Sequence, residues 1–123
     1  MKYSFVTVTV KDMEESAKFY KDVLGMKEVR RFTPQPGVDI MFLKDEGGSA
    51  IELISHEGNE DFIGRIPVSI GFDVDSLEDT GAMLKERGVV ISRGPLGAPG
   101  GVRFLFVKDP NGVEIEFIEG FQL

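Results

Sequence analysis

Cysteine is absent from the chain, which excludes disulfides, thiolate metal sites and a cysteine nucleophile. Histidine occurs once, as His56. Positive charge is also scarce, because 14 Lys and Arg against 21 Asp and Glu give a net charge of −7. An acidic surface makes nucleic acid and anionic membranes poor partners and suits a cationic or neutral ligand better. No apolar run approaches the roughly 20 residues that span a bilayer, and the first residues lack the apolar core of a signal peptide. We therefore expect a cytoplasmic protein with a small-molecule ligand.

The remaining composition is that of a folded protein. Apolar residues make up 41% of the chain and charged residues 28%, which argues against disorder. A length of 123 residues is that of one domain with its own core.

The chain contains an internal repeat. Residues 37–54 read GVDIMFLKDEGGSAIELI and residues 101–118 read GVRFLFVKDPNGVEIEFI, and they share nine of eighteen residues at an offset of 64. Both copies place a glutamate between apolar neighbours, Glu52 in the first and Glu116 in the second. This similarity indicates a duplication, and it raises the question of what the repeated carboxylate does.

The first copy begins with an alternating segment, YSFVTVTV, which predicts a strand with two different faces. Asp12 and Glu15 have the spacing of a helix N-cap and its capping partner, and Gly25 is expected to end that helix. Turn residues then separate three runs that predict strands, near 27–33, 38–44 and 50–56.

The second copy repeats this order. A strand is expected over 67–74, a helix between the cap Ser76 and Gly88, and strands near 89–93, 102–108 and 113–119. Gly25 and Gly88 differ by 63 rather than 64, so one residue slips locally. The segment Pro95–Gly101, PLGAPGG, is interpreted as a lid or, in preference, as a long hairpin loop.

The pattern predicts an α+β fold of two tandem βαβββ modules. One helix cannot cover both faces of a four-stranded sheet, so two modules are expected to curl their sheets around a shared cleft, as a curved eight-stranded half-open barrel. The expected organisation is a single domain over 1–123, with module 1 at 1–57, a linker at 58–66 and module 2 at 67–123.

The opening FVTVTVKDMEESAKFYKDVLGM, the closing DPNGVEIEF and the duplicated βαβββ order resemble the vicinal oxygen chelate superfamily. This family includes glyoxalase I, extradiol dioxygenases, fosfomycin-resistance proteins and bleomycin resistance proteins. The resemblance covers nearly the whole chain and implies the fold and a homodimer. It does not imply one function, because the fold serves both enzymes and proteins that only bind.

The resemblance also implies a metal site with two ligands from each module, one on the first strand and one on the fourth. The first-strand positions, usually histidine, match Phe5 in FVTVTV and Ser69 in SIGFDV, and 5 plus 64 is 69. The fourth-strand positions match Glu52 and Glu116, and a glutamate at such a site is the catalytic base in glyoxalase I. The chain thus keeps both carboxylates and loses both histidines. Zinc and nickel prefer nitrogen or sulfur ligands, whereas two carboxylates with waters could hold Mg²⁺ or Mn²⁺ loosely.

Two interpretations of the glutamates stay open. In one, Glu52 and Glu116 face each other in the cleft and hold an ion, a cationic group or a shared proton, so that the pair could act as general acid and base. In the other, both point to solvent as remnants of a metal site. His56 is not expected to be an extra ligand, since four strand residues place it roughly 13 Å from Glu52.

The other candidate residues would bind the ligand. Phe5 fills the space of a lost metal or stacks on a ligand, and Tyr3 and Thr7 share its strand face. Asp39 and its repeat mate Arg103 recognise a polar group or form surface ion pairs. The predicted set is therefore Glu116 and Glu52 as catalytic or metal residues, with Phe5, Ser69, Arg103 and Tyr3 at the ligand.

Three functions follow from this set. The first is a metal-poor small-molecule binder, like the bleomycin-binding members, with a flat, partly apolar ligand. The second is a glyoxalase I-like (lactoylglutathione lyase-like) lyase or isomerase, which uses an altered Mn²⁺, Mg²⁺, Ni²⁺ or Zn²⁺ site or the glutamate pair alone for proton transfer. The third is a structural or regulatory partner that uses only the fold. Whether the chain is an enzyme stays open at this point.

Overall fold

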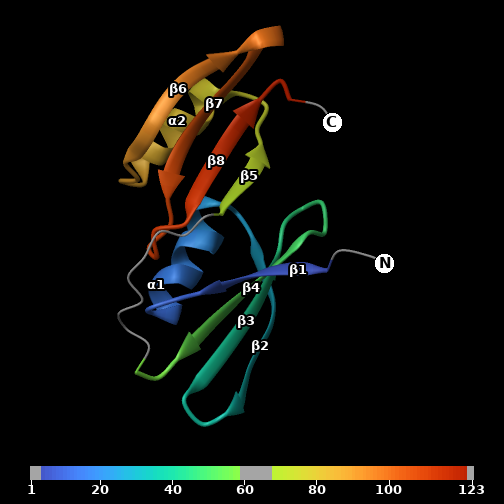
Figure 1. Ribbon diagram of the computed structural model, residues 1–123, viewed down its shortest axis with the longest axis vertical. Helices are drawn as coiled ribbons and strands as arrows, with labels where there is room; N and C mark the ends of the chain where they lie inside the picture. The colour runs from blue at the N-terminus through green and yellow to red at the C-terminus, as the bar shows by residue number, and fades with distance from the viewer. Residues whose placement is uncertain (1–3, 59–67, 122–123) are drawn as a thin grey trace. The chain divides into compact units, whose positions relative to one another are not determined.

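Each half of the chain forms a four-stranded sheet with one main helix, in a computed structural model that describes residues 4–58 and 68–121 (Figure 1). The chain divides into two compact units, unit 1 (Met1–Gly64) and unit 2 (Arg65–Leu123). Both units have the order strand, helix, and three further strands. The expected α+β fold with two βαβββ modules is therefore confirmed, while the module boundaries stay a prediction.

Unit 1 has its strands in the order β1-β4-β3-β2, with β1 parallel to β4 and the other neighbours antiparallel. The segment between β1 and β2 combines an α-helix with a π-helical turn, η1. The elements are β1 (Phe5–Thr9), α1 (Met13–Lys18), η1 (Phe19–Val23), β2 (Lys27–Gln35), β3 (Val38–Lys44) and β4 (Ala50–His56).

The core of unit 1 forms because one face of the sheet and one face of α1 are both apolar. Alternation along β1 directs Val8 to the buried side, and Leu53 and Met41 on β4 and β3 are fully buried. The helix begins at Asp12, whose Oδ1 accepts the N–H of Glu15 at 2.9 Å, as the cap spacing predicted. Each fully buried side chain of this size contributes about 1.5–3 kcal/mol.

Arg31 joins three elements of unit 1. Its Nη2 lies 2.6 Å from Glu14 Oε1 on α1 and 2.7 Å from Asp39 Oδ2 on β3. Hydrogen bonds to Asp39 and then Glu14 raise the pKa of the Arg31 guanidinium further above its usual range. Of the two roles left open for Asp39, the structure therefore shows the ion pair.

Unit 2 has the strand order β5-β8-β7-β6, with the same parallel and antiparallel pairings. The cap Ser76 accepts the N–H of Asp79 at 3.1 Å, as expected. No helix in the described part of the chain is long and apolar enough to cross a membrane. The elements are β5 (Ser69–Asp73), α2 (Leu77–Glu86), β6 (Ile91–Ala98), η2 (Pro99–Gly101), β7 (Val102–Lys108) and β8 (Glu114–Glu119).

The interpretation of Pro95–Gly101 as a lid or loop was wrong for its first half. Strand β6 continues to Ala98, and only Pro99–Gly101 forms a short 3₁₀ turn. Proline is tolerated here because β6 is an edge strand and its pairing with β7 shifts register between Arg93 and Leu96. A bulged edge strand does not need the backbone N–H that Pro95 lacks.

The one-residue slip between the repeats is located in η1. Leu24 donates its N–H to the carbonyl of Phe19, five residues earlier, at 3.3 Å. This is the π-helical pattern, which accommodates one more residue than an α-helical turn. The helix α2 carries no such turn, so four residues separate Tyr20 from Gly25 but only three separate Leu84 from Gly88.

Candidate functional site

A row of four side chains crosses the unit 1 sheet on the face turned away from α1, called the far face here. In the strand register, Thr7 on β1 lies opposite Glu52 on β4, Glu52 opposite Phe42 on β3, and Phe42 opposite Arg30 on β2. These residues alternate with the buried ones that pack toward α1. We call these four residues the first row.

Unit 2 carries a matching second row on the far face of its own sheet. Gly71 on β5 lies opposite Glu116 on β8, Glu116 opposite Phe106 on β7, and Phe106 opposite Arg93 on β6. The duplication has therefore preserved the register and the order of a glutamate, a phenylalanine and an arginine across three strands.

Both predicted glutamates lie in these rows, and each is half-buried. Phe5 and Ser69 lie on the same far faces, two residues before the first members of the rows. The prediction that both glutamates face one shared cleft concerns the arrangement of the two units, and it stays a prediction.

The other two predicted ligand contacts do not join these groups. Arg103 lies three residues before Phe106 on β7, so it is on the opposite face of the sheet. Its neighbour on β8 is Glu119, whose Oε1 accepts the N–H of Leu77 at the start of α2. Arg103 is therefore on the helix side of its sheet. Tyr3 lies outside the described residues.

The two glutamates differ in their neighbours. Thr7 Oγ1 donates a hydrogen bond to Glu52 Oε1 at 2.7 Å. The matching residue in unit 2 is Gly71, which has no side chain to donate such a bond. A Cβ added to Gly71 would lie 4.0 Å from Glu116 Oε1, so the two positions are close. Among the described residues, none donates a hydrogen bond to the Glu116 carboxylate. Glu116 is thus the more available carboxylate of the pair.

Phe5 forms one wall of a pocket on the far face of unit 1. Its ring meets Phe42 edge to face, with centroids 5.1 Å apart and planes at 87°, and 40% of Phe5 stays exposed. The ring therefore contacts a neighbour without being covered. The pocket measures about 670 Å³, within the usual range for small-molecule sites. It is lined by Ser4, Phe5, Val29, Arg30, Phe42, Lys44, Gly48 and Ala50.

Both rows place an arginine over an aromatic ring. The guanidinium carbon of Arg30 lies 4.4 Å from the centroid of Phe32, and that of Arg93 lies 4.1 Å from the centroid of Phe106. Sequence reasoning missed these arginines and Phe42. Phe42 and Phe106 are among the nine shared residues, but the arginines match only at the slipped offset, since 93 minus 30 is 63.

The donor atoms within either unit do not fit a tightly held divalent ion. In unit 1 the two implied ligand positions offer one carboxylate, already bonded to Thr7, and the ring of Phe5. In unit 2 they offer the hydroxyl of Ser69 and the carboxylate of Glu116. The described residues contain no group of three or more His, Cys, Asp or Glu placed to share a metal.

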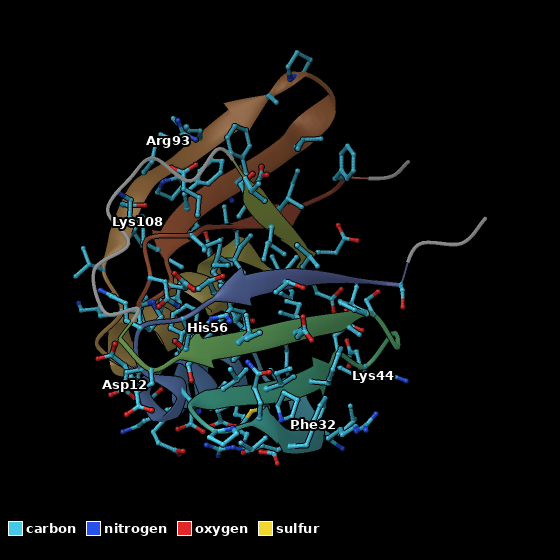
Figure 2. All side chains as sticks on the ribbon, turned by 60° about the horizontal axis from the view of Figure 1, so that its bottom comes forward. Asp12, Phe32, Lys44, His56, Arg93 and Lys108 are labelled. Carbon is cyan, nitrogen blue, oxygen red and sulfur yellow. The ribbon has the colours of Figure 1, made fainter. Side chains whose placement is uncertain are left out.

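His56 does not complete such a site. It is exposed at the last position of β4, where it lies opposite Val38. Lys44 lies at the other end of the sheet, as the labels of His56 and Lys44 in Figure 2 show. Lys44 is one of the residues that line the pocket.

Comparisons with known proteins agree with the repeated fold. The family model described as Glyoxalase/Bleomycin resistance protein/Dioxygenase superfamily matches residues 2–117. A lactoylglutathione lyase of Haemophilus influenzae is 35% identical over 117 residues, which are 89% of this chain and 86% of that protein. A probable chloroplastic lactoylglutathione lyase of Arabidopsis thaliana is 32% identical over 120 residues, or 93% of this chain. The chain spans only 34% of the Arabidopsis protein.

A solved structure gives the same result for the fold. The glyoxylase/bleomycin resistance protein/dioxygenase domain from Frankia sp. EAN1pec superposes with a TM-score of 0.81 at 24% identity, over 98% of both chains. Because the family model covers nearly the whole chain, the assignment does not depend on a single relative. The chain belongs to the glyoxalase/bleomycin resistance protein/dioxygenase superfamily.

Proposed function

We propose that the chain is a small-molecule binder that works without a tightly held metal, and that its ligand lies in the far-face pocket of unit 1. The observation that carries this proposal is Phe5, which stands where the family places a metal ligand and instead forms an aromatic wall with Phe42. A ring without a donor atom cannot bind a metal, but it can stack against a flat apolar ligand.

The pocket has the composition of a ligand site. Its walls combine two phenylalanines with Val29 and Ala50, while two cations provide polar contacts. Small-molecule sites are mostly apolar with a few polar groups that fix orientation. Phe5 and Val29 are 40% and 53% exposed, so a bound ring would cover apolar surface that now faces water.

The second candidate function is a lyase or isomerase similar to glyoxalase I. The identity to lactoylglutathione lyases favours it, and so does Glu116, a half-buried carboxylate with no hydrogen-bond donor among the described side chains. In this function Glu116 or Glu52 would accept a proton from a carbon next to a carbonyl. The loss of both first-strand histidines argues against it. The homodimer that the family resemblance implies stays a prediction for either function.

Thermal shift and product analysis together separate the two functions. Aromatic compounds are screened for an increase in melting temperature, and each one that binds is recovered and analysed for chemical change. Binding without conversion, unaffected by EDTA and weakened at least about tenfold by Phe42→Ala, is the expected result.

The control is an assay with the hemithioacetal of glutathione and a 2-oxoaldehyde, with Mn²⁺, Ni²⁺ or Zn²⁺ added. Turnover that disappears in Glu116→Gln but survives Phe42→Ala would contradict the binder and establish the lyase.

A further inference from the structure

Two cations, Arg30 and Lys44, line the far-face pocket of unit 1, and none of the eight lining residues is acidic. This local charge is opposite in sign to the net charge of −7. A ligand in the pocket therefore meets positive charge first, and the net charge of the chain is a poor guide to what binds there.

Neither cation has a carboxylate partner in the described part of the chain. Other cations of unit 1 do have such partners: Lys21 pairs with Glu28, and Arg31 pairs with Glu14 and Asp39. The chain has more acidic than basic side chains, so a lack of available carboxylates does not explain why Arg30 and Lys44 are unpaired. Two unpaired cations lining one pocket attract an anion.

The geometry of Arg30 suits a planar anion. Its guanidinium carbon lies over the ring of Phe32, 4.4 Å from the centroid, and a guanidinium held against a ring can still donate N–H bonds from its edge. Phe42 separates Arg30 from Glu52 in the first row, and two strand spacings amount to about 10 Å. Glu52 accepts a hydrogen bond from Thr7, and the described residues show no ion pair between Glu52 and Arg30.

We propose that the pocket selects aromatic carboxylates. The ring lies against Phe5 and Phe42, and the carboxylate is within reach of Arg30 and Lys44. This inference rests on the proposed binding function and adds the class of ligand. It differs from the cationic or neutral ligand that the net charge predicts, because the lining of the pocket carries the opposite charge.

The test uses three probes that share one ring system: 2-naphthoate, 2-naphthamide and 2-naphthylmethylammonium. Their affinities for the full chain are measured by equilibrium dialysis in low salt and in high salt. Arg30→Gln and Lys44→Gln remove one cation each from the pocket. Lys18→Gln is the matched control, because it makes the same charge change on α1, away from the far face.

The expected result is that 2-naphthoate binds at least about tenfold more tightly than 2-naphthamide. Each pocket variant is expected to reduce this preference at least about threefold, and Lys18→Gln to leave it unchanged. High salt should weaken the binding of naphthoate and not that of naphthamide. Unchanged naphthamide binding in the variants shows that they are folded.

Other results overturn the inference in distinguishable ways. Equal affinity for all three probes, lost in Phe42→Ala, overturns the selectivity for carboxylates and leaves the binding function intact. Tightest binding of the ammonium probe also overturns it and indicates that Glu52 is the recognition group. Absence of binding by every probe overturns the inference, and the proposed function fails as well only if the thermal-shift screen of aromatic compounds also finds no ligand.

Discussion

Thr7 and Gly71 are the residues that make the two glutamates different. The register is the same in both units, so Glu52 and Glu116 have equivalent places on their sheets. Within residues 4–58 and 68–121, Glu52 receives a hydroxyl donor and Glu116 does not, because the residue opposite Glu116 has no side chain. A change of one residue on the first strand is thus enough to leave a carboxylate available.

We expect Gly71→Thr to stabilise the protein. Apart from the chain neighbours of Gly71, the described residues place no atom other than Glu116 Oε1 within 4 Å of the added Cβ. The new hydroxyl can donate to that carboxylate as Thr7 does to Glu52. Glycine is unfavourable in a strand and threonine is favourable, so the free energy of unfolding should rise by about 1 kcal/mol in urea titrations.

Gly71→Ala is the control for this exchange, since it adds the Cβ without the hydroxyl. The free energy of unfolding of the threonine variant should exceed that of the alanine variant by about 0.5–1 kcal/mol. A threonine variant that is no more stable than the alanine variant would show that Glu116 gains nothing from a donor at this position.

The sequence alone located only part of the far-face groups. Glu52, Glu116, Phe5 and Ser69 could be placed because the repeat and the family resemblance mark their positions on the first and fourth strands. Arg30 could not, because its contact with the pocket depends on the pairing of β2 with β3, which contains register shifts. Register depends on tertiary pairing rather than on the composition of a single strand.

At the scale of elements, η1 is the main difference between the two modules. A π-helical turn commonly arises from one residue inserted in an α-helix. The strands on both sides keep their faces, so the insertion has been absorbed where the helix ends. The sequence showed the slip between Gly25 and Gly88 but not its form, because hydrogen-bond patterns at helix ends are not encoded by apolar spacing alone.

Deletion of Asp22 is expected to convert η1 into a regular helical turn like that of α2. Asp22 is exposed, and its removal leaves three residues between Tyr20 and the helix-ending glycine, as between Leu84 and Gly88 in unit 2. The free energy of unfolding should change by less than about 1 kcal/mol in urea titrations, because no core side chain is moved.

Deletion of Met41 is the comparison, since one residue removed from β3 turns every following side chain of the strand to the other face. This variant should not fold. If deletion of Asp22 were equally damaging, the π-helical turn would be a required part of unit 1 rather than an absorbed insertion.

At the scale of the whole molecule, the βαβββ order of both units was predictable because the same pattern occurs twice in the sequence. Caps, turn glycines and alternating strands agree in each copy, and such agreement is strong evidence for a fold. The end of β6 was not predictable, because glycine and proline in PLGAPGG are typical of loops and are tolerated here only at a bulged sheet edge.

Metal binding tests the molecule as a whole, since its two candidate carboxylates come from different units. We expect no stoichiometric metal in untagged protein after dialysis, and only weak association in calorimetric titrations with Mn²⁺, Ni²⁺ and Zn²⁺. The reason is the donor set, which lacks nitrogen and sulfur at the first-strand positions.

The Glu52→Gln/Glu116→Gln double variant controls the metal titrations. The weak association of each metal ion should be the same in this variant as in the original chain. Tight 1:1 binding that the double variant abolishes would contradict the expectation and favour the lyase.

The extra residue in η1 also affects how relatives should be aligned. With a constant offset of 64, Arg30 is matched to Gly94, and the arginine of the second row is missed. A gap placed inside the helix matches Arg30 to Arg93, and a compensating gap between residues 30 and 37 restores the offset of 64 that matches Phe42 to Phe106 and Glu52 to Glu116. Alignments that confine gaps to loops will therefore understate how often homologous chains keep this pair of arginines.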